Sequence, residues 1–518
     1  MSKIRVGLFT PIDFKVREKS LKSLLKLESL VIDILRKEGI EVIRGGDQFP
    51  KASQLAWNTQ LVHSHIKRIA QKKPDALIIN EVDWTLPYDS IDAINIFQRE
   101  TKDIARTIIF GYKTPEIPGL ETGIAVGGGL RGIGASYQLC YGAIDKDPQV
   151  LQELINILQF YKRRSEAEET VKSAIEKLSK QKYLAFGGMS LRIITGTADI
   201  EQWQKLFGIS YEALDQSEIK VRALELVKWK DRPGESDYEI VDDRVKKAID
   251  FLYKKGHGKF DFSRKTLPSI NKLVQQVSLY YATLDICCEY GITFAGVKCQ
   301  TEMTFHECSA CFLTSYLNND VGPEGETKKI IPVACEADMN NALTQLWMHL
   351  LTGKPAGFGD FRDVRGDTLF IVNCGQHPPY FFGGPQEDAI KKLDRVEYMG
   401  QEQEHSPAGG SSVRGRTPGG QVMTIARLAR ENLRYYLVAT VLHTVEVPLD
   451  EHSKYGISWP IIKGEAPISG DRLIRTWPCN HLAFSFGDLT PHLVEMAERL
   501  NIGYQVFDQK GREYTKPS

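Results

Sequence analysis

The chain has 518 residues, and its 66 lysines and arginines balance 66 aspartates and glutamates, so the formal net charge is zero. This balance argues against a nucleic-acid-binding or membrane-surface protein, because both usually carry a basic excess. The longest apolar stretch, Tyr435–Leu442, is too short to cross a membrane, and the N-terminus lacks the apolar core of a secretory signal. Nine cysteines without framework spacing indicate reduced thiols, so we expect a cytoplasmic protein.

The first third alternates short apolar strands with helical segments. A strand is predicted at Ile4–Thr10 and a helix at Leu21–Lys37, and further strands at Ala76–Asn80 and Thr107–Gly111. This alternation predicts a doubly wound, Rossmann-like parallel sheet. The glycine run 127–132 matches a dinucleotide-binding pattern but does not follow the first strand, so we interpret it as a glycine-rich turn.

Changes of composition predict three domains. Leu151–Lys182 is charged and helical, and we interpret it as one helix that leaves the first domain. A polar loop at Asn318–Lys329 marks a second boundary. We predict a Rossmann-like α/β domain at 1–182, a second doubly wound α/β domain at 183–328, and a C-terminal domain at 329–518 that completes the functional site.

Two carboxylates follow consecutive predicted strands in the third domain. Ile330–Cys335 reads as a strand that ends at Glu336, and a helix leads from it to a short strand that ends at Asp360. A β-α-β unit of this kind places both acids at the carboxyl ends of parallel strands, where open α/β sheets bind ligands. The alternative is that both are exposed loop acids beside a helix N-terminus.

His481 is a candidate third member of this group. It follows Asn480 and begins an apolar strand, although a lone histidine is more often structural. Two carboxylates and one imidazole form a hard, oxygen-rich site that suits Mn²⁺ or Mg²⁺.

These segments resemble the L-fucose isomerase family. The resemblance covers E-A-D-M-N-N-A-L and F-G-D-F-R between Glu336 and Arg362, Asn480-His481 before SFGD, and Tyr183–Ser190. It implies a three-domain, Mn²⁺-dependent aldose–ketose isomerase that forms a homo-oligomer, usually a hexamer, with Mg²⁺ or Co²⁺ as alternative ions.

The resemblance also implies roles for individual residues. Glu336, Asp360 and His481 would be the metal ligands, and both carboxylates would serve as acid–base groups. Gln300 falls, with a one-residue offset, where the family has an active-site glutamine. Asn480 is a further candidate for sugar binding.

Other positions bear on the substrate. The family has an arginine close to the position of Phe9 and a tyrosine at the position of Gly410. Arg414 and Arg416, in the Gly- and Ser-rich loop 405–420, either grip an acidic substituent of the sugar or lie on a solvated loop. A neutral deoxysugar and an anionic sulfo- or phosphosugar are therefore both candidate substrates. Trp84 either stacks on the sugar of a neighbouring subunit or is a surface aromatic.

Three other classes of function stay open at this point. A non-catalytic sugar-binding protein would not need a metal triad. A carboxylate-pair glycosidase would not need His481, and its activity would survive EDTA. A dehydrogenase rests on the glycine run alone.

Overall fold

The computed structural model describes residues 3–104, 106–261 and 269–517, which divide into two compact units. One unit contains the residues up to Glu169, Val494–Tyr504 and the segment from Tyr514 onward, and the other contains Thr170–Leu493 and Gln505–Glu513. The three sequence ranges 1–182, 183–328 and 329–518 stay a prediction. Within the described ranges, no helix is long and apolar enough to cross a membrane.

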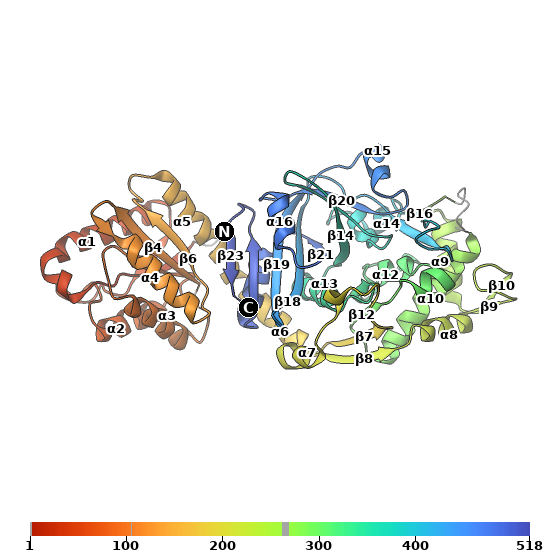
Figure 1. Cartoon of the computed structure of the whole chain (residues 1–518), viewed down its shortest axis with the longest axis horizontal. Coiled ribbons are helices and arrows are strands. Elements are labelled where there is room, and N and C mark those ends of the chain that lie inside the picture. Colours follow the sequence, from red (N-terminus) through yellow and green to blue (C-terminus); the bar gives the residue numbers. More distant parts are fainter. Residues whose placement is uncertain (1–2, 105, 262–268, 518) are drawn as a thin grey trace. The chain divides into compact units, whose positions relative to one another are not determined.

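The first unit, drawn mostly in red and orange in Figure 1, is built on a parallel sheet. The strand order is β2-β1-β3-β4-β6, and the short β5 pairs antiparallel with β4. Its strands are β1 (Arg5–Phe9), β2 (Glu41–Arg44), β3 (Ala76–Glu81), β4 (Thr107–Thr114), β5 (Ile117–Pro118) and β6 (Gln138–Gly142). Its helices are α1 (Phe14–Lys37), α2 (Thr59–Gln71), α3 (Pro87–Thr101), α4 (Gly119–Gly132) and α5 (Pro148–Glu166). The strand order confirms the predicted doubly wound α/β sheet.

Two sequence interpretations in this region are wrong. The glycine run 127–132 lies inside α4 and is not a turn. The segment predicted as one helix at Leu151–Lys182 forms α5 and α6 (Glu168–Leu178), which are separated at Ala167. The strand that follows, β7 (Lys182–Phe186), begins where the sequence predicts it.

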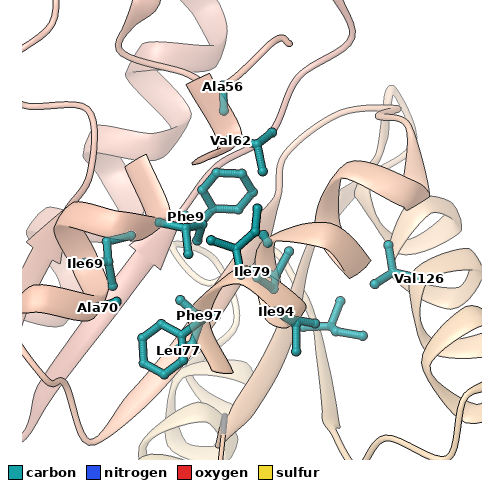
Figure 2. Close-up of a cluster of buried hydrophobic side chains, with 14 of the residues drawn as sticks. Phe9, Ala56, Val62, Ile69, Ala70, Leu77, Ile79, Ile94, Phe97 and Val126 are labelled. Carbon is teal, nitrogen blue, oxygen red and sulfur yellow. The ribbon is translucent and has the colours of Figure 1, made fainter. Parts of the chain in front are cut away.

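Continuous apolar runs explain how this sheet is buried. Every residue of β3 is buried, as is typical of a parallel strand covered on both faces. Figure 2 shows Phe9, Leu77 and Ile79 of the sheet in one cluster with Ile69 of α2 and Phe97 of α3.

The second unit contains a four-stranded parallel sheet in the order β8-β7-β12-β13. Its other strands are β8 (Ser210–Leu214), β12 (Phe294–Val297) and β13 (Val333–Cys335). The helices of this unit's N-terminal part are α7 (Ile200–Phe207), α8 (Ser217–Leu226), α9 (Asp243–Ile249), α10 (Ile270–Glu289), α11 (Glu302–His306) and α12 (Cys311–Leu317). This sheet confirms the second parallel α/β layer that the sequence predicts.

Two smaller sheets lie in the same unit. An antiparallel pair is formed by β9 (Val227–Trp229) and β10 (Tyr238–Ile240). A three-stranded sheet is formed by β11 (Lys259–Asp261), β16 (Glu397–Gly400) and β17 (Ser411–Arg414). The segment 405–420, expected to be a loop, therefore contains one strand.

The remainder of the second unit contains a closed antiparallel barrel that the sequence analysis did not foresee. The ring runs β18-β21-β14-β15-β20-β19 and closes because β18 and β19 pair along their whole length. Its strands are β14 (Gly357–Arg365), β15 (Thr368–Val372), β18 (Val422–Glu431), β19 (Arg434–Thr444), β20 (Ile461–Glu465) and β21 (His481–Phe486). Apolar side chains of these strands, including Ile425, Val438 and Phe484, form one buried cluster. The barrel is a packed core and not an open channel.

The last elements follow or flank the barrel. The helices are α13 (Met339–Thr352), α14 (Ala389–Leu393), α15 (Leu449–His452), α16 (Gly470–Thr476) and α17 (Thr490–Arg499). The strands β22 (Gly503–Phe507) and β23 (Glu513–Lys516) belong to the barrel's sheet.

The predicted β-α-β unit around Glu336 and Asp360 is wrong. Strand β13 lies at the edge of the parallel sheet, whereas β14 is an antiparallel barrel strand between β15 and β21. Helix α13 connects them and contacts β12 and β13 as well as β18 and β21. The helix therefore carries the chain from one sheet into another instead of returning it to the first.

A buried carboxylate ties the C-terminal part of the first unit to its sheet. Glu495 is fully buried, and its oxygens lie 2.7 Å from Arg106, 3.1 Å from Arg164 and 2.9 Å from Arg499. Burial alone would raise the pKa of Glu495, but the charges of Arg164 and Arg106 outweigh it and lower that pKa. The carboxylate therefore stabilises the fold in its ionised form.

Replacement of this carboxylate should destabilise the protein strongly. We expect Glu495→Gln to lower the free energy of unfolding by about 3 kcal/mol, because buried guanidinium groups lose their counter-charge. The control Asp471→Asn removes one partner of an exposed pair with Arg475 and should cost less than about 1 kcal/mol. Urea unfolding of both variants measures the difference, and equal midpoints would contradict the role assigned to Glu495.

Candidate metal centre

Glu336 stands on a tight turn at the carboxyl end of β13. The amide of Asp338 donates to the carbonyl of Cys335 at 3.1 Å, which closes the turn over Glu336 and Ala337. Both central residues have left-handed backbone, with φ of +56° and +49°. This conformation is costly for residues with a side chain and is found where the surrounding structure enforces it, often at functional sites.

Asp360 and His481 face each other across two barrel strands. They are direct partners in the antiparallel pairing of β14 with β21. His481 is buried, and its Nε2 lies 3.4 Å from Oδ1 of Asp360 and 3.2 Å from Oε2 of Glu336. Glu336 and Asp360 therefore both lie next to the same imidazole nitrogen of His481, although the three residues come from different elements.

A third carboxylate holds the other nitrogen of this ring. Oδ2 of Asp338 lies 2.7 Å from Nδ1 of His481, and Arg427 of β18 donates to the same oxygen at 2.7 Å. The second oxygen, Oδ1, caps α13 by accepting from the amide of Asn341. Because both oxygens of Asp338 are occupied, this residue orients the histidine ring.

The charges of these groups shift one another's pKa values. Burial would raise the pKa of Asp338, but Arg427 and His481 lower it to about 2. Burial would lower the pKa of His481, but the interactions of the ring with Asp338, Glu336 and Asp360 raise it above its usual value. The Asp360 side chain is 27% exposed, but the surrounding protein desolvates its carboxyl group. This desolvation and the charge of Glu336 raise the pKa of Asp360 to about 6.

Two sets of side chains around His481 have the chemistry to hold a divalent cation. Ligand atoms of Asp338, Cys479 and His481 lie within 4.8 Å of one another. In the second set, Glu336 and Asp360 face Nε2, which is buried without a hydrogen-bond partner among the described residues. The second set fits a metal ion better, because Asp338 is already bound to Arg427 and a metal-binding histidine typically gives its other nitrogen to a carboxylate.

Two neighbouring amides hold the Asp360 carboxylate in place. Asn480 donates to Oδ1 at 2.9 Å, and Asn373, which follows β15, lies 3.3 Å from Oδ2. Asn480 is therefore part of the cluster, but its bond is to a carboxylate. Gln300 is buried, and its amide lies 2.9 Å from Nε2 of His405.

His405 links Gln300 to the cluster. Its pKa is raised by contact with the Cys374 thiol and, among smaller causes, by the charge of Glu336. Gln300 thus contacts a histidine on which the charge of Glu336 acts.

Two other predicted binding residues, Arg414 and Arg416, are not brought to this cluster. Trp84 belongs to the first unit, where it is 44% exposed, and its role stays a prediction. Arg414 is buried in an ion pair with Glu397, and Arg416 donates to the carbonyl of Val447 at 2.9 Å. Both arginines line a separate cavity that contains none of the cluster residues.

The two positions that depart from the family are both closed to polar side chains. Phe9 is buried in the apolar cluster of the first sheet. Gly410 has φ of +104°, and a Cβ there would lie 2.7 Å from Oγ of Ser309. A tyrosine at this position would be strained and crowded.

The sequence did not predict four further residues of the site and its surroundings: Asp338, Arg427, Asn373 and His405. Two of them left a signal. Asp338 stands where a helix N-cap is expected, and Arg427 is a charged residue inside the apolar run of β18. A charge in a buried strand needs a buried partner.

The Asp338 pairing predicts a pH-dependent contribution to stability. Its folded pKa lies below the ordinary value, so the stabilisation is present above about pH 4 and is lost as the pH falls toward 2. We expect Asp338→Asn to destabilise the fold by about 3–5 kcal/mol at pH 7, because Arg427 stays buried without its counter-charge.

Urea unfolding at pH 7 and pH 3 measures this effect. The control Glu302→Gln, which removes one partner of the exposed pair with Lys298, should behave like the parent. A loss for Asp338→Asn that does not shrink toward low pH would show that Asp338 acts by packing and not by charge.

Comparisons with known proteins find similarity to L-fucose isomerases. The family described as "L-fucose isomerase, C-terminal domain" matches residues 371–507, which include His481 but neither Glu336 nor Asp360. The L-fucose isomerase of Streptococcus pneumoniae (strain Hungary19A-6) is 20% identical over 395 residues, covering 65% of this chain and 66% of the relative. That of Haemophilus influenzae is 22% identical over 404 residues, covering 67% of each. The chain spans about two thirds of the length of these relatives and is similar to L-fucose isomerases over that part.

Proposed function

We propose that this protein is a metal-dependent aldose–ketose isomerase of the L-fucose isomerase type, acting through an enediol intermediate. The observation that carries the proposal is the position of Nε2 of His481, 3.2 Å from Glu336 and 3.4 Å from Asp360. Those three side chains would hold the ion, for which Mn²⁺ is the first candidate and Mg²⁺ or Co²⁺ the alternatives. When bound, such an ion supplies Lewis-acid chemistry at the sugar oxygens.

The carboxylates are proposed to move the protons. Conversion of an aldose to a ketose transfers one proton from C2 to C1 and a second from O2 to O1. Glu336 and Asp360 would each accept and return a proton, one at carbon and one at oxygen. A pKa of about 6 suits Asp360 to this exchange near neutral pH.

Positioning would come from neutral neighbours. Asn480 and Asn373 hold the Asp360 carboxylate through side-chain amides, which leaves its charge uncompensated. Asp338 fixes His481 so that Nε2 faces the ion in the neutral imidazole.

The substrate and the assembly are parts of the same proposal. L-Fucose is the sugar in the names of the relatives, and a neutral deoxysugar is our first candidate, because Arg414 and Arg416 line another cavity. An anionic sugar is the second candidate. We also propose a cytoplasmic homo-oligomer, in which the exposed Trp84 reaches the sugar of a neighbouring subunit.

Loss of either carboxylate should remove turnover without unfolding the protein. Glu336→Gln and Asp360→Asn should lower kcat by about 10²–10⁴-fold on a panel of neutral and anionic aldoses, because each removes one acid–base group. The control Glu465→Gln lies at the exposed end of β20 and should retain the parent rate. Parent-like turnover in Glu336→Gln would refute the assigned role.

Chelation separates the alternatives. EDTA should abolish activity and Mn²⁺ should restore it, whereas a glycosidase would hydrolyse glycosides in EDTA. Sugar binding without any interconversion in the Mn²⁺-loaded parent would favour a non-catalytic binding protein.

Metal binding should depend on pH with a definite sign. Asp360 and His481 both have raised pKa values and must lose protons before they can bind a cation. We therefore expect the rise in Tm caused by Mn²⁺ to be large at pH 8 and small at pH 5, as measured by differential scanning fluorimetry. A rise that is the same at both pH values would place the ion elsewhere.

A further inference from the structure

A basic cavity lies on one face of the three-stranded sheet β11-β16-β17. It has a volume of about 380 Å³. Lys259, Glu397 and Arg414 form one rung across this sheet, since Lys259 is in register with Glu397 and Glu397 with Arg414. Arg416 follows two residues later, so the three cations reach the same cavity from β11, β17 and the segment after β17. Arg395, Phe382, Pro418 and Glu446 complete the polar and apolar lining.

The cations of this cavity exceed the carboxylates that can neutralise them. Glu397 pairs with Arg414, and Arg395 pairs with Glu387 outside the cavity lining. Among the ion pairs of the described residues, Lys259 and Arg416 take part in none. Besides Glu397, the carboxylate in the cavity lining is Glu446, and its Oε2 already accepts from the backbone amide of Gly419 at 3.1 Å.

A buried histidine nearby reports the positive potential. His452 is buried, with Nε2 2.6 Å from the carbonyl of Trp459. Burial lowers its pKa to about 4, and the charges of Arg414 and Arg416 both contribute to that decrease. The charges of both guanidinium groups therefore act on the buried ring of His452.

The shape of the cavity supports a small ligand. Its volume is within the range of small-molecule sites. Gly415, between the two arginines, packs against the Phe382 ring with no room for a Cβ, which fixes the backbone that carries both side chains. A planar guanidinium group can donate two parallel hydrogen bonds to two oxygens of one phosphate or sulfonate group. Arginine is therefore the side chain best suited to bind these anions.

We propose that this cavity is a binding site for a small dianion, a phosphate group free or attached to a metabolite, separate from the metal centre. Arg416 and Lys259 supply the uncompensated charge, and Arg414, held by Glu397, forms the rigid side of the site. The proposal does not depend on the isomerase activity, because none of the cavity's lining residues belongs to the Glu336, Asp360 and His481 cluster.

Calorimetric titration of inorganic phosphate into the full-length protein tests the proposal. The protein is first treated with EDTA and dialysed, so that phosphate cannot bind through a metal ion. We expect saturable binding to one site per chain that weakens as KCl is raised. No saturable heat at millimolar phosphate would overturn the proposal.

Variants locate the binding. Arg416→Gln should weaken phosphate binding about 10-fold or more, since a charge-assisted hydrogen-bond donor is lost. Lys259→Gln removes an exposed lysine and should weaken binding with no effect on folding. The control Arg475→Gln changes an exposed side chain of α16 that pairs with Asp471, and should bind like the parent. Parent-like affinity in both Arg416→Gln and Lys259→Gln would overturn the assignment.

A second titration identifies the source of the dianion. Glucose 6-phosphate is compared with glucose and with inorganic phosphate. Binding of the phosphosugar more tightly than phosphate indicates a metabolite site, and equal binding indicates a site for the free anion. Binding of glucose as tight as that of its phosphate would refute recognition of the charged group.

Discussion

The candidate site depends on one buried interaction, the contact of Asp338 with His481. One carboxylate oxygen of Asp338 forms hydrogen bonds with both Nδ1 of His481 and the guanidinium group of Arg427, and all three groups are buried. A histidine held in this way presents Nε2 in one direction only. Without Arg427 the carboxylate would be a buried charge without compensation, which is among the most costly features a protein can contain.

The same interaction joins elements that the chain brings from distant regions. Arg427 also donates to the carbonyl of Thr195 at 2.8 Å, and Asn340 donates to the carbonyls of Thr195 and Thr197. The start of α13, strand β18 and the segment before α7 are therefore fixed to one another by a hydrogen-bonded network. Such a network keeps Glu336 and the barrel strands in register around His481.

The two carboxylates of the cluster come from different architectures. Glu336 stands on a strained turn after a parallel strand, where small changes of backbone would move the side chain. Asp360 is set into a barrel whose apolar interior allows little movement. In the proposed reaction, Asp360 is thus held rigidly by the barrel, whereas Glu336 lies on a turn. This arrangement suits two proton transfers at neighbouring atoms of one sugar.

Sequence alone determined the parallel sheets and α13, through apolar runs and helix caps. Its resemblance to the L-fucose isomerase family singled out Glu336, Asp360 and His481 as candidate metal ligands, and these roles stay a prediction. The sequence did not determine the barrel or its strand partners, because antiparallel pairing between strands distant in sequence leaves no local periodicity. For the same reason, only the tertiary structure decided that Asp360 faces His481 across β14 and β21, that Asp338 with Arg427 orients the ring, and that Arg414 and Arg416 line a cavity of their own.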